Sequence, residues 1–262
     1  MKKILKHLKQ QVILLFYAIS YFTRLPIPAS ITFDNEQFHK ANAYLPIIGI
    51  AIALMMMTIF TICQYFLSIP VSLIMMLIAS LLLTGALHED GFADCCDGLG
   101  GGYSATQRLK IMKDSQIGSY AGIGLVMLFL LKLTLLIELT EISHASLFIS
   151  LLIAHSLSRY GALCIMQTLP YVRLDADSKV KTLATKLPRG YFIFASLCAL
   201  PSLLLVVPSH MLIILCSTLL CGLMLAKFFS KNLQGYTGDC LGFAQQCIEL
   251  ITLLLLTVVL AL

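Results

Sequence analysis

The chain has 262 residues, of which 59% are hydrophobic and 12% charged, with a formal net charge of +5 and a mean hydropathy of +0.92. This composition excludes a water-soluble globule and predicts an all-α, polytopic membrane protein whose residues 1–262 form a single integral-membrane domain. The basic residues are spread over short loops beside apolar segments. We therefore exclude nucleic acid as a partner and expect a lipid bilayer instead.

The first apolar stretch, residues 12–22, follows four lysines and stops just before Arg24 and Pro26. It is too short for an ordinary membrane crossing, so we expect an interfacial or re-entrant helix there. The stretch also lacks the small-residue cleavage site of a signal peptide, and we expect the N-terminus to be retained.

Seven later segments have the length and apolar composition of transmembrane helices. They cover residues 43–66, 69–87, 117–138, 144–167, 190–207, 210–227 and 243–262. With a cytoplasmic N-terminus, every lysine and arginine lies on the inner side except Lys132 and Arg159, which fall within spans, in agreement with the positive-inside rule. We expect a protein of the bacterial cytoplasmic (inner) membrane whose polar segments, 23–42, 88–116, 168–189 and 228–242, share the cytoplasmic side.

The most polar of these segments contains Asp90, Asp94 and Asp97. On a helix, residues at i, i+4 and i+7 lie on one face, so the three carboxylates are predicted to converge. Unpaired carboxylates in hydrocarbon would be costly, and a divalent cation removes that penalty. The oxygen-rich neighbourhood favours Mg²⁺ over zinc despite the adjacent Cys95 and Cys96.

Glycines and cations surround the acidic residues. Gly98 follows Asp97 directly and lets the backbone approach a phosphate closely, although a simple turn at a helix end is the alternative. Arg108, Lys113 and Asp114 follow in the sequence. Carboxylates that bridge a metal, flanked by cations, are typical of phosphoryl transfer, whereas anchoring by the positive-inside rule is the alternative for the cations.

Three further polar positions stand in or beside the later spans. Arg159 is predicted either to clamp a phosphate or to snorkel to the interface, with His155 packed one turn before it. Lys132 is expected to snorkel or to pair locally with Glu138. Thr237 and Asp239 follow Gly235 in the polar loop that enters the last span, where they could contact a phosphate or simply start the helix.

Together these residues resemble the cobalamin synthase, or adenosylcobinamide-GDP ribazoletransferase, family. The matching pieces run in order through the chain: Phe22-Thr23-Arg24-Leu25-Pro26, Tyr44-Leu45-Pro46, His88, Asp90-Gly91, Ala93-Asp94, Asp97-Gly98, Lys113-Asp114-Ser115, Ile117-Gly118, Ser158-Arg159, Leu169-Pro170-Tyr171 and Tyr236-Thr237-Gly238-Asp239. Three positions depart from the family pattern: Gln116 replaces an arginine, Glu89 an apolar residue and Gln234 a glycine.

The resemblance implies a late step of cobalamin assembly. Either α-ribazole or its 5′-phosphate attacks adenosylcobinamide-GDP, which yields adenosylcobalamin or its 5′-phosphate and releases GMP. The implied roles are as follows: Asp90, Asp94 and Asp97 hold Mg²⁺; Arg24, Arg108, Lys113, Arg159, Thr237 and Gly98 bind substrate; and Asp114, Asp239 or His88 handles the hydroxyl proton. A homo-oligomer is also expected.

Two other classes of protein remain as alternatives. A CDP-alcohol phosphotransferase has a similar acidic signature, but the spacing here differs from it. A cation-coupled transporter would align ionisable residues at mid-membrane, whereas the acids here cluster beside one end of the spans.

Overall fold

The computed structural model describes residues 2–172 and 184–261, and these are helical almost throughout. In the first half, the elements are α1 (Lys2–Phe22), η1 (Phe38–Tyr44), α2 (Leu45–Cys63), α3 (Ile69–Thr84), α4 (Leu87–Gly101) and α5 (Ala105–Ile111). In the second half, they are α6 (Ser119–Ile142), α7 (His144–Thr168), α9 (Arg189–Ala199), η2 (Leu200–Leu205), α10 (Pro208–Leu233) and α11 (Gly238–Leu260). Within the described ranges there is no β-strand, only a bridge between Tyr171 and Tyr236. The all-α prediction is confirmed.

Five helices of the described chain are long and apolar enough to cross a membrane, namely η1 with α2, α6, α7, α10 and α11. A sixth span results if α3 and α4 are counted together, although they meet at an angle of 89°. The predicted span 190–207 is α9 followed by the short 3-10 helix η2, and the two form a shorter apolar helix. The multi-pass architecture is confirmed, whereas the predicted count of seven is not.

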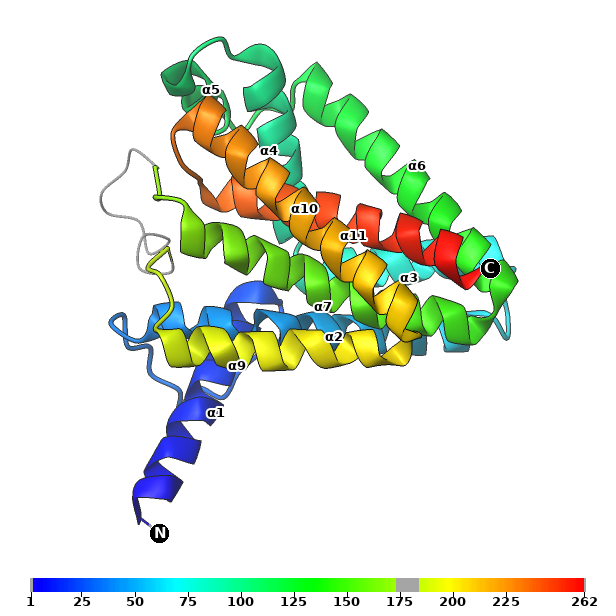
Figure 1. Ribbon diagram of the computed structural model, residues 1–262, viewed down its shortest axis with the longest axis horizontal. Helices are drawn as coiled ribbons and strands as arrows, with labels where there is room; N and C mark the ends of the chain where they lie inside the picture. The colour runs from blue at the N-terminus through cyan, green and yellow to red at the C-terminus, as the bar shows by residue number, and fades with distance from the viewer. Residues whose placement is uncertain (1, 173–183, 262) are drawn as a thin grey trace.

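Helix α7 is the centre of the bundle. Of its most apolar 18-residue window, 72% is buried inside the protein, against 28% for α6 and 22% for α10. Figure 1 shows α7 running between α2 and α11, with α6 and α10 on the outside. The outer helices expose leucines, isoleucines and methionines along their length, as helices that face lipid do.

Helix α1 begins at Lys2, ten residues earlier than the predicted start, and protrudes from the bundle (Figure 1). It is not among the helices apolar enough to span a membrane, in agreement with the predicted interfacial helix. Its last turns pack into the core through Leu14, Tyr17 and Phe22. The end of α1 therefore has a fixed place beside the other helices.

Side-chain caps start several of the helices. Ser104 accepts a hydrogen bond from the backbone N–H of Gln107 at the start of α5, and Thr237 accepts one from that of Cys240 at the start of α11. Figure 1 shows α5, the end of α7 and the start of α11 at the same end of the molecule. The polar segments thus share one end, as predicted, apart from residues 173–183, which lie outside the described ranges.

Candidate active site

A sharp break between α3 and α4 positions the acidic helix. Gly85 and Ala86 both have left-handed backbone conformations, with φ of 65° and 55°. Two such residues in succession turn the chain away from the axis of α3, and glycine makes the first of them sterically cheap. A Cβ on Gly85 would lie 2.2 Å from Nε of Arg24, so the break also gives the Arg24 side chain its place.

Glycines allow α4 to cross α11 at very short range. A Cβ added to Gly91 would lie 2.9 Å from the Cα of Asp239, and one added to Gly242 would lie 2.8 Å from the carbonyl oxygen of His88. Neither backbone can move aside as a flexible side chain could, so only glycine fits at the crossing. The crossing brings Asp90 and Asp94 of α4 to the same cavity as Asp239, although they are 149 and 145 positions away from it in the sequence.

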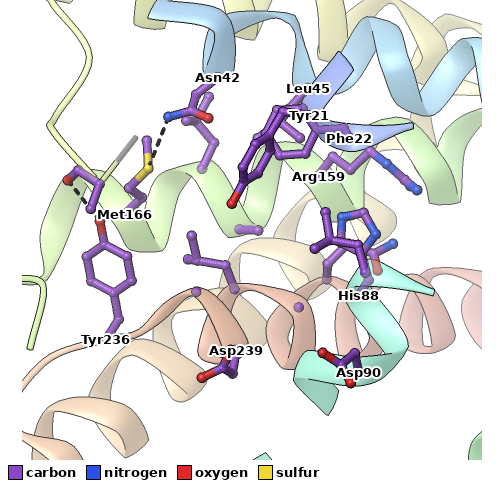
Figure 2. A pocket seen from close by; sticks show the side chains of 18 of the residues that line it. Tyr21, Phe22, Asn42, Leu45, His88, Asp90, Arg159, Met166, Tyr236 and Asp239 are labelled. Carbon is purple, nitrogen blue, oxygen red and sulfur yellow. Dashed lines mark hydrogen bonds between the residues drawn. The ribbon is translucent and has the colours of Figure 1, made fainter. Parts of the chain in front are cut away.

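An inner cavity of about 300 Å³ opens beside this crossing. It is walled by α1, α2, α4, α7 and α11. Figure 2 shows Asp90 and Asp239 at one end, Asn42 toward the other, Met166 and Tyr236 along one side, and His88 and Arg159 along the opposite side. The cavity therefore contains four of the predicted catalytic residues, since Asp94 also lines it.

An outer cavity of about 500 Å³ lies on the other face of α4, between α4 and α6. Asp90 and Asp94 line this cavity as well as the inner one, whereas Asp97, Lys113 and Asp114 line the outer cavity only. The two carboxylates thus stand at the junction of two separate spaces. Such a junction can receive two ligands, one from each space.

Asp90 also lines a third space, of about 410 Å³, at the break between α3 and α4. Arg24 and Thr23 line the same space. The structure thereby brings the predicted substrate-binding Arg24 to the same carboxylate that the other two cavities share.

Asp97 has a different environment from the other two aspartates. Its carboxylate accepts hydrogen bonds from the backbone N–H of Gly118 at 2.6 Å and from that of Ala121 at 2.9 Å. A Cβ on Gly118 would lie 2.6 Å from one of these oxygens. Asp97 therefore caps the N-terminus of α6, where a negative charge is favourable. Asp97 lines the outer cavity with the other two carboxylates, as periodicity predicts, and the first turn of α6 engages it in addition.

The described residues contain no group of three or more acids, histidines or cysteines close enough to hold a metal ion by themselves. Magnesium is commonly held by one or two carboxylates and completed by substrate phosphates and water. Asp90 and Asp94, one helical turn apart and facing two cavities, fit that incomplete type of site. The residues thus suit a metal that arrives with, or is completed by, a phosphate substrate.

Arg159 lines the inner cavity from α7 and is only 2% exposed. Its terminal nitrogen lies 3.0 Å from Nδ1 of His155 and donates to the His155 carbonyl oxygen. Its Nε has no hydrogen-bond partner among the described residues. The guanidinium is therefore not a snorkelling group but a buried cation beside the cavity, with a donor to spare.

Behind Arg159 lies a buried polar network that sequence reasoning missed. Glu249 of α11 lies 2.7 Å from Nζ of Lys132 on α6 and 3.8 Å from Arg159. Gln246 accepts from Lys132 and donates to Glu89. Lys132 was expected to snorkel or to pair with Glu138, and that expectation is wrong, because its partner comes from another helix. The spacing of Gln245, Gln246 and Glu249 inside an apolar span was the available signal.

Two predicted substrate-binding residues have structural contacts in the described chain and line none of the cavities above. Arg108 donates from Nε to the Gly102 carbonyl and from its terminal nitrogen to the Asn232 carbonyl, which ties α5 to the ends of α4 and α10. A Cβ on Gly98 would lie 2.4 Å from the Met112 side chain, so Gly98 serves close packing. The geometry gives neither residue a place next to a substrate.

The remaining predicted residues fall near the cavities. Thr237 donates to Asp239 at 3.2 Å while capping α11, and Asp239 lines the inner cavity. His88 is buried and lies between the inner cavity and the polar network. Tyr236 donates its hydroxyl to the Ala184 carbonyl, and burial raises the pKa of its phenol, so it acts as a neutral wall of the cavity.

Comparison with known proteins gives a consistent result. The profile of the family described as cobalamin-5-phosphate synthase matches residues 14–257. A Shewanella piezotolerans protein is 38% identical over 251 residues, which cover 96% of this chain and 97% of that protein. A Pseudoalteromonas atlantica protein is 38% identical over 97% of this chain and 94% of its own, and a Vibrio cholerae protein is 36% identical over 95% of each. All three are named adenosylcobinamide-GDP ribazoletransferase. No solved structure matches the chain.

Proposed function

Since the chain belongs to the cobalamin-5-phosphate synthase family, we propose that it is an adenosylcobinamide-GDP ribazoletransferase, as its relatives are named. It joins adenosylcobinamide-GDP to α-ribazole or α-ribazole 5′-phosphate. A ribose hydroxyl oxygen forms a bond to the phosphorus next to cobinamide, and the bond from that phosphorus to the oxygen of GMP breaks. GMP leaves with the electron pair of that bond, and the hydroxyl proton passes to a base of the protein.

The observation that carries this proposal is that Asp90 and Asp94 line two cavities at once. A phosphoryl transfer places the attacking and leaving oxygens on opposite sides of the phosphorus. A pair of groups at the junction of two spaces suits such a reaction, because each space admits one reactant.

Asp90 and Asp94 would hold Mg²⁺ together with the diphosphate of the substrate. When bound, the ion stabilises the negative charge that develops on the phosphoryl oxygens. Arg159 supplies a buried positive charge with an unused Nε donor on the inner side, and Lys113 a positive charge on the outer side. Arg24 faces Asp90 from the third space.

The base is one of the acids or the histidine at the cavities. Asp239 lines the inner cavity, Asp114 the outer one, and His88 the inner one. Any of them within hydrogen-bond reach of the ribose hydroxyl would accept its proton. The distribution of lysines and arginines further supports a location in the cytoplasmic membrane of a bacterium, with the polar end of the bundle facing the cytoplasm.

The test is the reaction itself. Purified protein in detergent or lipid nanodiscs receives adenosylcobinamide-GDP and either form of ribazole, with Mg²⁺ or with EDTA, and GMP and the cobalamin product are measured. Metal-dependent formation of both products is expected. No product from folded protein with either acceptor, or turnover of a CDP-linked donor instead, would refute the proposal.

Asp94→Asn provides the matched variant, because it removes a charge from the cavity junction with almost no change in size. It is expected to abolish transfer. Glu141→Gln is the control, since Glu141 is exposed near the far end of α6, and it should leave the rate unchanged. Normal metal-dependent turnover by Asp94→Asn would exclude the role assigned to this carboxylate.

A further inference from the structure

The inner cavity is lined by two chemically different sets of side chains. Tyr21, Phe22, Tyr171 and Tyr236 contribute aromatic rings, and Leu163 and Met166 add apolar surface. Asp90, Asp94 and Asp239 contribute carboxylates, and Figure 2 shows Asp90 and Asp239 below Tyr21 and Phe22, with Tyr236 to one side. A ligand that fills this space therefore has a flat apolar part joined to a part that carries hydroxyl groups.

Resting on the proposed function, we propose that the inner cavity is the binding site of ribazole, with its fused aromatic base among the aromatic side chains and its ribose toward Asp239. The donor, adenosylcobinamide-GDP, then reaches Asp90 and Asp94 from the outer cavity between α4 and α6. Neither assignment is contained in the names of the relatives. The assignment also makes Asp239 the nearest candidate for the base that accepts the ribose proton.

The aromatic side chains support the placement of the ribazole base in the inner cavity. The rings of Tyr171 and Tyr236 are 5.4 Å apart in an edge-to-face arrangement, and those of Tyr21 and Phe22 are 4.9 Å apart. Both pairs are fixed by their surroundings: Tyr236 is 1% exposed and Phe22 7% exposed. Rigid aromatic walls favour a planar base, because stacking and edge contacts add to simple burial.

The volumes of the two cavities support the assignment of ribazole to the inner cavity and of the donor to the outer one. A cavity of about 300 Å³ is at the lower end of the range for small-molecule sites and suits a nucleoside. The corrinoid ring of the donor is several times larger and has no room there. The outer cavity is larger, at about 500 Å³, and exposed residues such as Lys113, Asp114 and Gln116 line it, so a bulky donor can extend from it.

The position of the shared carboxylates completes the argument. The acceptor oxygen approaches the phosphorus from the inner side of α4, and GMP leaves on the outer side, as an in-line displacement requires. Asp239 lies at the inner side, where the hydroxyl proton is released, and Lys113 at the outer side, where the negative charge of GMP develops. Each side thus carries a group of the appropriate charge.

A pair of fluorescent reporters tests the assignment, because the natural chain contains no tryptophan. The Phe22→Trp variant reports on the inner cavity and the Phe129→Trp variant on the outer one. With EDTA present to prevent turnover, α-ribazole is expected to change the emission of the Phe22→Trp reporter. Saturating GDP, the probe for the donor, should leave that signal in place and should not compete with α-ribazole for binding to the unmodified protein.

Several outcomes would overturn the assignment. Displacement of α-ribazole by GDP would place both ligands in one site, and a response to α-ribazole by the Phe129→Trp reporter alone would reverse the two sites. If α-ribazole gives no signal with free protein, the titration is repeated with adenosylcobinamide-GDP in EDTA. Absence of a signal there as well, from a reporter that still turns over in Mg²⁺, also overturns the assignment.

A cavity-filling substitution provides a kinetic test. Ala162 lines the inner cavity, and Ala162→Phe is expected to raise the KM for α-ribazole by about tenfold while the KM for adenosylcobinamide-GDP changes little. Ala145→Phe, at an exposed position on the same helix, is the control and should change neither. Equal effects of Ala162→Phe on both KM values would contradict the assignment. Turnover by the unmodified protein distinguishes a failure of the proposed function from a failure of the cavity assignment. If the unmodified protein makes no product, the proposed function is refuted. If it does make product, a failed binding test refutes only the assignment of ribazole to the inner cavity.

Discussion

The different roles of the acidic residues on α4 lead to a prediction that separates metal binding from helix capping. Asp97→Asn keeps one oxygen that can accept from Gly118 or Ala121, but it places an NH₂ group against the other backbone N–H. A charge-assisted hydrogen bond contributes about 1.5–3 kcal/mol, and a charge at a helix N-terminus adds about 0.3–1 kcal/mol. Because Asp97 is only half-buried, water compensates part of the loss, and we expect about 2 kcal/mol of destabilisation.

The assay for this prediction has two measurements on the purified protein. A loss of about 2 kcal/mol lowers the Tm by about 4–8 °C for a chain of this length. We expect the Mg²⁺ concentration that gives half-maximal transfer to be that of the unmodified protein, because both Asp97 oxygens already accept hydrogen bonds from backbone N–H groups of α6 and its cap. Asp90→Asn is the matched comparison: Asp90 is exposed, so the Tm should hardly change, while the metal dependence should be weakened or lost.

The result that would refute this reasoning is the reverse pattern. An Asp97→Asn variant with an unchanged Tm and a raised Mg²⁺ requirement would show that Asp97 is a metal ligand, as the helical spacing predicted. A lowered Tm together with an unchanged metal requirement would assign it to the fold.

Three further predictions concern packing, backbone strain and buried charge. Gly242→Ala should push α4 away from α11 and lower the transfer activity at least about tenfold. Gly222→Ala is the control, because a Cβ there meets no other atom, and it should be neutral or stabilising. Equal activities of the two variants would contradict the close crossing of α4 and α11. Gln234 has φ of 64°, so Gln234→Gly should stabilise by about 1 kcal/mol in thermal unfolding, and a destabilisation would count against this. Lys132→Met and Glu249→Gln should each cost about 3–5 kcal/mol, and the double variant should cost about 1–3 kcal/mol less than their sum. Strict additivity in this cycle would mean that the pair does not interact.

The fold class and the main functional segment were predictable because they depend on local features. Apolar length indicates helices in a membrane, and the four-residue spacing of Asp90 and Asp94 indicates one face of a helix. Charge distribution also predicted that the polar segments share one end. The residues of Phe22-Thr23-Arg24 and Tyr236-Thr237-Gly238-Asp239 indicated the family before their place beside the cavities was known.

Features that depend on which helices meet were not predictable from the sequence. Asp97 lines the outer cavity with the other carboxylates, as its spacing predicts, but its role as the cap of a helix that starts 22 residues later has no signal in the spacing. Lys132 and Glu249 are 117 positions apart, and no periodicity relates them. The break at Gly85 and Ala86 was missed because an apolar run predicts where a helix lies but not where it bends.

The buried network under the cavity is better explained by position than by stability. Replacing a buried ion pair with apolar side chains is often neutral or even stabilising, so stability alone does not require these charges. Arg159, however, lines the cavity, and its terminal nitrogen lies 3.0 Å from Nδ1 of His155 and 3.8 Å from Glu249. Glu249 is in turn held by an ion pair with Lys132 and a hydrogen bond from Gln245. A guanidinium fixed in this way need not reorganise when a phosphoryl group approaches, which is the condition under which a buried cation lowers a transition-state energy most effectively. We therefore expect the polar residues of α6, α7 and α11 to act together with the carboxylates of α4, although none of the three helices carries the acidic motif.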